Sequence, residues 1–331
     1  MSAAIETIDL TRRYGRHLAL DRLNLSIAPG TIYGLIGPNG AGKTTTLRLL
    51  AGLLEPTSGQ IRLLGTPLDR AGRIAQRRVG YMPDFFGVYD NLRVWEYLDF
   101  FARCYDLPAA RRRATVDGLL ELVDLADKRN ALVQDLSRGM QQRLCLAHAL
   151  VHDPPILLLD EPASGLDPRA RLELRELLRT LREMGKTIIL SSHILSELAE
   201  ICTALGIMHQ GRLVASGTIE AVRRQLGVGR RLRLTILRGL AQAEAVLRAT
   251  PQAGQPTVLE ESPTAPPTDA PVTARLPELH APPRTLLVPW SGDADATAAL
   301  IQRLVSAGVA LLAFGEDSND LEDLFLQITA A

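Results

Sequence analysis

Short apolar stretches separated by turn residues run through the first sixty positions of the chain. Ile5–Leu10 and Leu23–Ile27 alternate or cluster apolar side chains, and Pro29-Gly30 marks a turn. Thr31–Ile36 and Gly59–Leu63 repeat the strand pattern on either side of a glycine-rich segment and an apolar helical run. This part of the chain therefore predicts short strands interrupted by one helix.

From Val94 onwards the apolar spacing becomes that of helices. Two amphipathic segments lie between Val94 and Asp127 and are separated near Leu107-Pro108. The next predicted elements are a helix over Met140–Leu150, a strand over Ile156–Asp160, a helix over Pro168–Met184, a strand over Thr187–Ser191, a helix over Ile194–Ile201 and a strand over Ala204–His209. Strands that alternate with helices predict an α/β fold with a mainly parallel sheet covered on both faces.

The character of the chain changes beyond about residue 226. Ten of the twenty prolines fall between residues 251 and 289, a stretch whose composition argues against a helix or a central strand. The flanking predictions are strands over Arg231–Leu237, Thr285–Val288 and Val309–Phe314 and helices over Ala241–Arg248 and Asp295–Ala307. We predict one domain over 3–226 and a small α+β domain over 227–331, with a proline-rich insertion at about 261–283; the alternative is a partly disordered tail.

Composition narrows the classes of function. The 331 residues suffice for two domains, and 37 basic against 37 acidic side chains give no net charge to attract nucleic acid. Cys104, Cys145 and Cys202 fit neither a disulfide framework nor a metal knuckle, which favours a reducing compartment. No stretch approaches the ~20 apolar residues that span a bilayer. We therefore expect any membrane role to depend on a partner.

The candidate chemistry begins at the glycine-rich segment. It fits G-x-x-x-x-G-K-[ST] and reads Gly37-Pro38-Asn39-Gly40-Ala41-Gly42-Lys43-Thr44-Thr45. Gly40 and Gly42 allow φ > 0, so that backbone N–H groups can approach phosphates at the start of a helix. Lys43 offers an ammonium to the β- and γ-phosphates, and the Thr44 hydroxyl can bind Mg²⁺. The loop predicts a nucleoside triphosphate site; the alternative is a turn with an incidental Gly-Lys-Thr.

Two carboxylates follow the apolar run Ile156–Leu159. Charges on a buried strand are tolerated at its tip, where a cation or water can meet them. Asp160 can hold Mg²⁺, directly or through water, and Glu161 is placed to act as general base for the attacking water. The two acids could instead cap the next helix, but beside a phosphate loop the catalytic interpretation is favoured.

A second candidate phosphate cradle lies in Leu136–Arg143, just before this strand. Ser137 predicts a helix N-cap, and Gly139 lets backbone N–H groups reach outward. The helix that begins here suits an anion without a lysine. Because one nucleotide needs one cradle, the second cradle predicts a second subunit that faces the first.

Together these motifs resemble the nucleotide-binding subunits of ATP-binding-cassette (ABC) transporters, over about residues 3–226. Leu136–Gln141 is similar to the family signature, in which Ser137, Gly139 and Gln141 would contact the nucleotide of the other subunit. Ser164–Asp167 resembles the loop that crosses the dimer interface. Two further resemblances are Tyr14, similar to the aromatic residue that stacks on adenine, and His193, similar to the switch histidine at the γ-phosphate.

The resemblance implies a P-loop NTPase cassette with a RecA-like mainly parallel sheet, an antiparallel β-subdomain and a helical subdomain at about residues 84–150. It implies a subunit that binds ATP and Mg²⁺, hydrolyses ATP, and pairs with a second ATP-binding subunit, most simply as a homodimer. It also implies a peripheral position on the cytoplasmic face of the membrane, beside a separate permease, and no nucleic-acid partner.

In the signature, Arg138 and Met140 replace the commoner Gly and Gln, and a further departure from the family pattern bears on the chemistry. Gln usually follows the strand equivalent to Arg78–Met82, where this chain has Asp84. A carboxylate can accept from water or lie near the metal, but it is shorter, charged and unable to donate. Acidic replacements occur in relatives that act with simple export permeases, so the resemblance favours export and the drug-resistance-like branch of the family.

Aromatic residues are concentrated in one segment, with nine of fourteen between Tyr81 and Tyr105. Part of this cluster has the helical spacing of a core, but exposed aromatic groups favour protein interfaces. In ABC proteins this surface receives a short helix of the membrane subunit. We therefore expect the permease to dock near Phe85, Phe86 and Tyr89.

Two other functions stay open at this point. A soluble ABC-type ATPase could act on ribosomes or DNA, although such relatives usually have two cassettes or a long coiled coil, and this chain has one phosphate loop and no heptad run. A nucleotide-binding regulator without turnover is disfavoured by the joint presence of Asp160, Glu161 and His193. The ending Leu321–Phe325 resembles the tail of export-type subunits, and the domain from about residue 227 carries no catalytic constellation.

Overall fold

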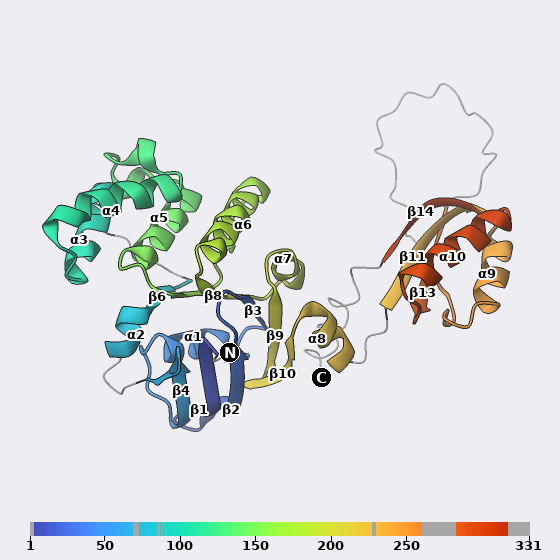
Figure 1. Cartoon of the computed structure of the whole chain (residues 1–331), viewed down its shortest axis with the longest axis horizontal. Helices are drawn as coiled ribbons and strands as arrows, with labels where there is room; N and C mark the ends of the chain where they lie inside the picture. Colours follow the sequence, from blue (N-terminus) through green and yellow to red (C-terminus); the bar gives the residue numbers. More distant parts are fainter. Residues whose placement is uncertain are drawn as a thin grey trace. The chain divides into compact units, whose positions relative to one another are not determined.

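The chain divides into two compact units between Val222 and Arg223 (Figure 1). The computed structural model of the protein describes residues 3–68, 73–84, 87, 89, 91–226, 230–259 and 283–316. Each unit has its own sheets, helices and hydrophobic core.

The larger unit is built on a six-stranded sheet with the order β10-β9-β3-β8-β7-β6. Its strands are β3 (Ile32–Ile36), β6 (Val79–Met82), β7 (Ile156–Leu159), β8 (Thr187–Ser192), β9 (Ala204–His209) and β10 (Arg212–Gly217). Neighbours pair in parallel except β10, which is antiparallel to β9. Every residue of β3, β7 and β8 is buried, as expected of parallel strands covered on both faces. The predicted α/β fold class is confirmed.

An antiparallel sheet of order β2-β1-β4-β5 adjoins it. Its strands are β1 (Ile5–Tyr14), β2 (His17–Ile27), β4 (Ser58–Leu63) and β5 (Thr66–Pro67). Between the two sheets lies α1 (Lys43–Leu50), which adds Leu47, Leu49 and Leu50 to a core shared with both (Figure 1). The β1–β2 hairpin extends beyond its predicted apolar segments to a two-residue turn at Gly15-Arg16.

Some helices of the larger unit lie along the six-stranded sheet, and others form a group to one side of it (Figure 1). They are α2 (Arg73–Arg78), α3 (Val94–Cys104), α4 (Ala109–Leu122), α5 (Arg138–Leu150), α6 (Pro168–Glu183) and α7 (Leu195–Ala199), with short 3₁₀ turns at Ala126–Lys128 and Val133–Asp135. The next helix, α8 (Ile219–Gln225), contains the point at which the two units divide. The break predicted near Leu107-Pro108 falls between α3 and α4. Within the described ranges, no helix has both the length and the apolar character needed to cross a membrane.

The smaller unit has the order β12-β13-β11-β14, with every neighbouring pair antiparallel. Its elements are β11 (Arg230–Arg238), α9 (Leu240–Arg248), β12 (Thr257–Leu259), β13 (Arg284–Trp290), α10 (Ala294–Ser306) and β14 (Ala310–Glu316). This βαββαβ arrangement is that of ferredoxin-like domains. Leu234 on β11 and Leu247 and Leu304 on the helices belong to its core.

The proline-rich stretch corrects one expectation. We expected no central strand between residues 251 and 289, yet β13 lies in the interior of its sheet and contains Pro289. Pro289 is the last residue but one of the strand, and its carbonyl accepts a hydrogen bond from the Gly254 N–H (2.8 Å). A proline near a strand end removes one ladder donor without breaking the ladder. The predicted insertion lies outside the described residues, apart from Pro283.

Candidate nucleotide site

The phosphate loop follows β3 and leads into α1. Gly40 and Gly42 have φ of +83° and +105°, the conformations expected of them. A Cβ at Gly37 would lie 2.5 Å from the Met208 carbonyl oxygen, so this position also requires glycine. The first turn of α1 contains no acidic residue, which leaves the positive end of the helix facing the loop.

Lys43 is the first residue of α1 and is only 6% exposed. Its ammonium donates to the carbonyl oxygens of Gly37 (2.6 Å) and Pro38 (3.4 Å). It also lies 3.5 Å from Glu161 Oε1. The loop and the end of β7 therefore share one buried cation.

Asp160 follows β7 and is 1% exposed. Its Oδ1 accepts hydrogen bonds from the hydroxyls of Thr44 (3.2 Å) and Ser191 (2.7 Å). One carboxylate and one hydroxyl side by side suit Mg²⁺, which usually takes one or two protein oxygens together with substrate phosphates. Within the described part of the chain, no group of three His, Cys, Asp or Glu side chains could hold a metal by itself, and a phosphate-bound Mg²⁺ needs none.

Glu161 has φ of +49°, an uncommon conformation for a residue with a Cβ. Its N–H donates to Ser191 Oγ (2.9 Å), which helps to hold the backbone in this strained turn. The Glu161 carboxylate lies 3.0 Å from Nδ1 of His193, whose side chain is half exposed. The turn thus aims the carboxylate toward Lys43 and His193 rather than into the sheet.

Ser191 links the two acids, and the sequence analysis did not single it out. Its hydroxyl donates to Asp160 and accepts from the Glu161 N–H, so one side chain orders both acids. The available signal was the polar pair Ser191-Ser192 at the end of an otherwise apolar strand. Strand tips next to a phosphate loop are where such polar side chains can be used.

A cavity of about 260 Å³ opens over these groups, and its lining includes Tyr14, the phosphate loop, Asp84 and Glu161. Tyr14 is 41% exposed, with the Arg12 guanidinium 4.6 Å from its ring centre. Burial and the negative charges of Asp160 and Glu161 raise the pKa of Asp84. The protonated form of Asp84, which can donate, is therefore more accessible than the sequence analysis assumed.

The predicted signature residues lie at the start of α5. Ser137 caps the helix as expected, accepting from the Met140 N–H (3.3 Å), and the Gln141 side-chain amide donates to the Val133 carbonyl (3.3 Å). A Cβ at Gly165 would lie 2.6 Å from Arg138 Cζ, so the signature contacts the Ser164–Asp167 loop. Ser137, Gly139 and Gln141 are not among the residues that line the cavity.

The aromatic segment is only partly exposed. Phe85 and Phe86, predicted to contact a permease, lie outside the described residues. Tyr97 is 2% exposed, whereas Tyr89 and Phe100 are 56% and 44% exposed and meet edge to face at 5.8 Å. Four of the described rings, those of Tyr89, Tyr97, Phe100 and Phe101, thus pack on one another, and Tyr89 and Phe100 form a small exposed group.

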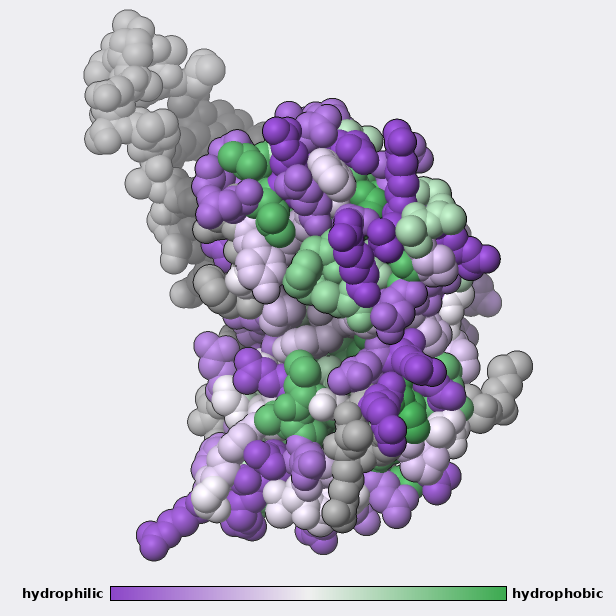
Figure 2. Space-filling model, turned by 90° about the vertical axis from the view of Figure 1, so that its left-hand side faces the viewer, coloured by the Kyte–Doolittle hydropathy of each residue, from purple (hydrophilic) through white to green (hydrophobic). Residues whose placement is uncertain are grey.

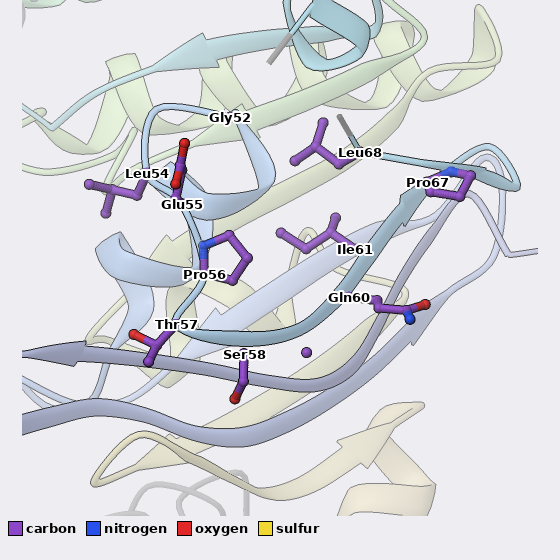
Figure 3. A pocket seen from close by; sticks show the side chains of 11 residues that line it. Gly52, Leu54, Glu55, Pro56, Thr57, Ser58, Gln60, Ile61, Pro67 and Leu68 are labelled. Carbon is purple, nitrogen blue, oxygen red and sulfur yellow. The ribbon is translucent and has the colours of Figure 1, made fainter. Parts of the chain in front are cut away.

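A separate hollow of about 490 Å³ lies between the segment after α1 and the strands β4 and β5 (Figure 3). The side chains of Pro56, Ile61 and Leu68 face it, and among the described residues of its lining Glu55 alone is charged. The part of this lining that the structure describes offers no cation and no helix N-terminus to bind a phosphate. The nucleotide chemistry is therefore assigned to the cavity over Lys43 and Glu161.

Comparisons with known proteins agree with this geometry. The family model for ABC transporters matches residues 20–164. The Nod factor export ATP-binding protein I of Paraburkholderia xenovorans (strain LB400) is 46% identical over 220 residues, which cover 66% of this chain and 72% of that protein. The chain belongs to the ATP-binding subunits of ABC transporters. The Nod factor export ATP-binding protein I of Burkholderia orbicola (strain AU 1054) is 44% identical over 220 residues, which again cover 66% of this chain and 72% of that protein.

Solved structures of ABC subunits also match. An ATP-binding subunit of an ABC transporter has a TM-score of 0.62 and 33% identity over 68% of this chain and 94% of that one. The cbiO1 protein from Clostridium perfringens, described as part of the transporter complex cbiONQ, has a TM-score of 0.61 and 27% identity over 69% and 96%.

Membership of this family confirms several predictions. The ABC subunit binds ATP and is an ATPase, and subunits of this kind work with membrane permease components. The alternative of a soluble ABC-type ATPase acting on ribosomes or DNA is not favoured, because the matched relatives are named as transporter subunits.

Proposed function

We propose that this ABC subunit hydrolyses Mg-ATP at a site completed by a second copy and thereby energises export through a separate permease. The observation that supports this proposal most directly is the convergence of Lys43, Asp160, Glu161 and His193 at the ends of adjacent strands, linked by contacts of 3.5 Å or less. These are the groups needed to bind a triphosphate, neutralise it and activate a water.

Each side chain has a distinct role in the proposed site. Thr44 and Asp160 would hold Mg²⁺, which neutralises charge on the β- and γ-phosphates when bound. Lys43 binds the same phosphates as a compact cation. Glu161 accepts a proton from the attacking water. His193 Nδ1 lies 3.0 Å from the Glu161 carboxylate and orients that carboxylate next to the γ-phosphate.

A second copy would complete the site. The helix end at Ser137–Gln141 offers backbone N–H groups and a hydroxyl, yet it does not line the cavity of its own chain. Head-to-tail pairing would bring this helix end to the nucleotide held by the partner. The adenine of that nucleotide would stack on Tyr14 of the chain that holds it. ATP then favours the closed dimer because its γ-phosphate contacts both chains, and hydrolysis removes that bridge.

Export is proposed from the relatives, which are named for Nod factor export. The subunit would then lie on the cytoplasmic face of the membrane, with the exposed ring group around Tyr89 and Phe100 facing the permease. Phe85 and Phe86 are included in this surface on sequence grounds alone. Charged substitution of Tyr89 should abolish transport but leave ATP binding by the purified subunit intact.

The test of the proposal is Glu161→Gln. Loss of the base should reduce kcat by about 10²–10⁴-fold. ATP binding should persist, and the closed dimer should accumulate with Mg-ATP in size-exclusion chromatography. Glu183→Gln, at an exposed position at the end of α6, is the matched control and should behave as the parent. Unchanged turnover in the Glu161 variant would contradict the role of this carboxylate.

A further inference from the structure

The phosphate loop lies against two strands of the larger unit. A Cβ on Gly42 would lie 2.7 Å from Leu20 Cδ2 and 3.2 Å from Met208 Cε. Leu20 belongs to β2 and Met208 to β9, and both side chains are fully buried. The backbone of the loop is therefore in close contact with both strands, and the turn that follows β9 adds a hydrogen bond to it.

This hydrogen bond fixes the direction of one peptide group. The Gly211 N–H, in the turn between β9 and β10, donates to the Ala41 carbonyl oxygen (3.0 Å). The peptide bond between Ala41 and Gly42 is trans, so its N–H points away from its carbonyl oxygen. Gly42 belongs to the described lining of the nucleotide cavity, and Ala41 does not. With the oxygen held by Gly211, the Gly42 N–H is therefore turned toward the cavity.

The next peptide group is fixed in another way. The Gly42 carbonyl accepts from the N–H and from the hydroxyl of Thr46, both at 2.9 Å, so α1 itself orients the Lys43 N–H. The Ala41 carbonyl has no such bond from α1; among the described residues, its donor is the Gly211 N–H. The orientation of the Gly42 N–H therefore depends on a residue far away in the sequence.

The conformation of the turn allows this contact. Gln210 and Gly211 have φ of +46° and +76°. They form the two-residue turn between the paired residues His209 and Arg212, and positive φ at both central positions is typical of a type I′ turn. A Cβ on Gly211 would lie 2.6 Å from the Ala19 carbonyl oxygen. Glycine is therefore required both by the conformation and by the close approach.

The turn is also bonded to β2. The Gly211 carbonyl accepts from the Asp21 N–H (3.0 Å), and Arg212 Nε donates to Asp21 Oδ2 (2.8 Å). His17 and Ala19, on the same strand as Asp21, line the nucleotide cavity. One turn thus holds both the phosphate loop and the strand beside it.

These contacts lie inside the larger unit and not on its outer surface. Figure 2 shows the side of the unit that carries α2 and α3, where hydrophilic residues predominate and apolar residues form separate groups. Behind the loop, in contrast, Ala41 is 2% exposed and Gly211 is buried. A hydrogen bond broken at such a depth leaves its donor and acceptor without water, at a cost that favours the bonded orientation.

We propose that Gly211 is a positioning residue for ATP binding, because its N–H holds the peptide group between Ala41 and Gly42 with the N–H facing the phosphates. In the reversed orientation a carbonyl oxygen would face the phosphates and repel them. Gly211 acts through Ala41 and is not part of the described lining of the cavity. This inference rests on the proposed function, because it takes the phosphate loop as the ATP site.

Two asparagine variants test the contact. The Leu64-Gly65 turn between β4 and β5 has φ of +51° and +75°, and no described atom would lie within 4 Å of a Cβ on Gly65. Asn tolerates positive φ, so Gly65→Asn and Gly211→Asn should differ mainly in the collision with Ala19. In calorimetry on the purified full chain, the Kd for ATP and for ADP should rise about tenfold in Gly211→Asn. The Kd of Gly65→Asn should equal that of the parent.

A purely structural role of Gly211 would give a different result. Gly211→Asn would then lower Tm in the absence of nucleotide, but its Kd and the increase in Tm caused by ATP would match those of the parent. This outcome would overturn the inference, and so would an equal loss of affinity in Gly65→Asn.

A second pair of variants decides the question if Gly211→Asn does not fold. Arg212 and Arg22 both pair with Asp21, but Arg212 adjoins Gly211, whereas Arg22 lies on β2 itself. Both arginine side chains are largely exposed, so their replacement should leave the fold intact. Arg212→Gln should loosen the turn and raise the Kd for ATP about threefold, and Arg22→Gln should leave it unchanged. Equal Kd values in these two variants would refute the positioning role.

Lys43→Ala separates this inference from the proposed function. Loss of ATP binding in Lys43→Ala, together with a parental Kd in Gly211→Asn, would reject the positioning role and leave the phosphate loop as the ATP site. Parental ATP binding by Lys43→Ala would instead remove the loop from the proposed site, and the inference with it.

Discussion

The two regions that we propose to face the nucleotide phosphates, one at the end of the sheet and one at the start of α5, are built from different groups. At the sheet end, Lys43, Asp160 and Glu161 are charged, largely buried and joined by contacts of 3.5 Å or less. At the helix end, Ser137–Gln141 supplies a hydroxyl, an amide and backbone N–H groups, but no carboxylate. The sheet end can carry out proton transfer and metal binding, whereas the helix end can only recognise an anion. In the proposed dimer, the chemistry and the recognition of the partner's nucleotide should therefore be separable by substitution.

Two substitutions of Ser137 should have the largest effect on activity and should separate recognition at the helix end from the chemistry at the sheet end. Ser137→Asp keeps a good helix cap but places a negative charge at the phosphate, so ATP-driven dimerisation and ATPase activity should be lost with little change in Tm. Ser137→Ala should cost about 1 kcal/mol of stability from the lost cap and reduce activity less. Light scattering with Mg-ATP and thermal unfolding check both, and dimerisation of the Asp variant would contradict the recognition role.

A smaller effect is expected at the sheet end from Ser191→Ala. This change removes the hydroxyl that orders Asp160 and Glu161 and leaves the Glu161 N–H without its acceptor. We expect kcat to fall about tenfold, since each lost hydrogen bond of this kind is worth about 1–3 kcal/mol. The KM for ATP should change little, because Lys43 and the loop amides are untouched. A raised KM with normal kcat would place Ser191 in ATP binding instead.

A third effect concerns the stability of the fold at low pH and not its activity. His148 lies near the end of α5, the helix that begins with the signature, and burial lowers its pKa to about 4. Between pH 6.5 and about 4 the folded ring is neutral, whereas the ring in the unfolded chain binds a proton over the same range. The free energy of unfolding should therefore fall by up to about 3 kcal/mol as pH decreases from 6.5 to 4.

Denaturant unfolding followed by Trp95 fluorescence, in a Trp290→Phe background, measures this dependence for the larger unit. His148→Phe should make the free energy of unfolding less dependent on pH. Part of the dependence should remain, because the pKa of His152 is also lowered. An unchanged slope in that variant would assign the loss of stability to other groups.

Strong local patterns predicted the parts of the site that lie on single elements. The glycine-rich loop, the acids after Ile156–Leu159 and the cap at Ser137 were readable because each is a short motif next to a periodic segment. Ser191 was not readable as a bridge, because its partners are about thirty residues away and pair with it only across the sheet. α2 was missed because only Ala75 of its six residues is buried.

The central claim is that the two ends act in trans, and mixed dimers test it most directly. A Lys43→Ala chain and a Ser137→Asp chain should each be inactive alone, because every composite site then lacks one half. Random mixing should restore about a quarter of the parental ATPase sites, since each mixed dimer contains one site with both halves intact. A mixture as inactive as its components would contradict the account.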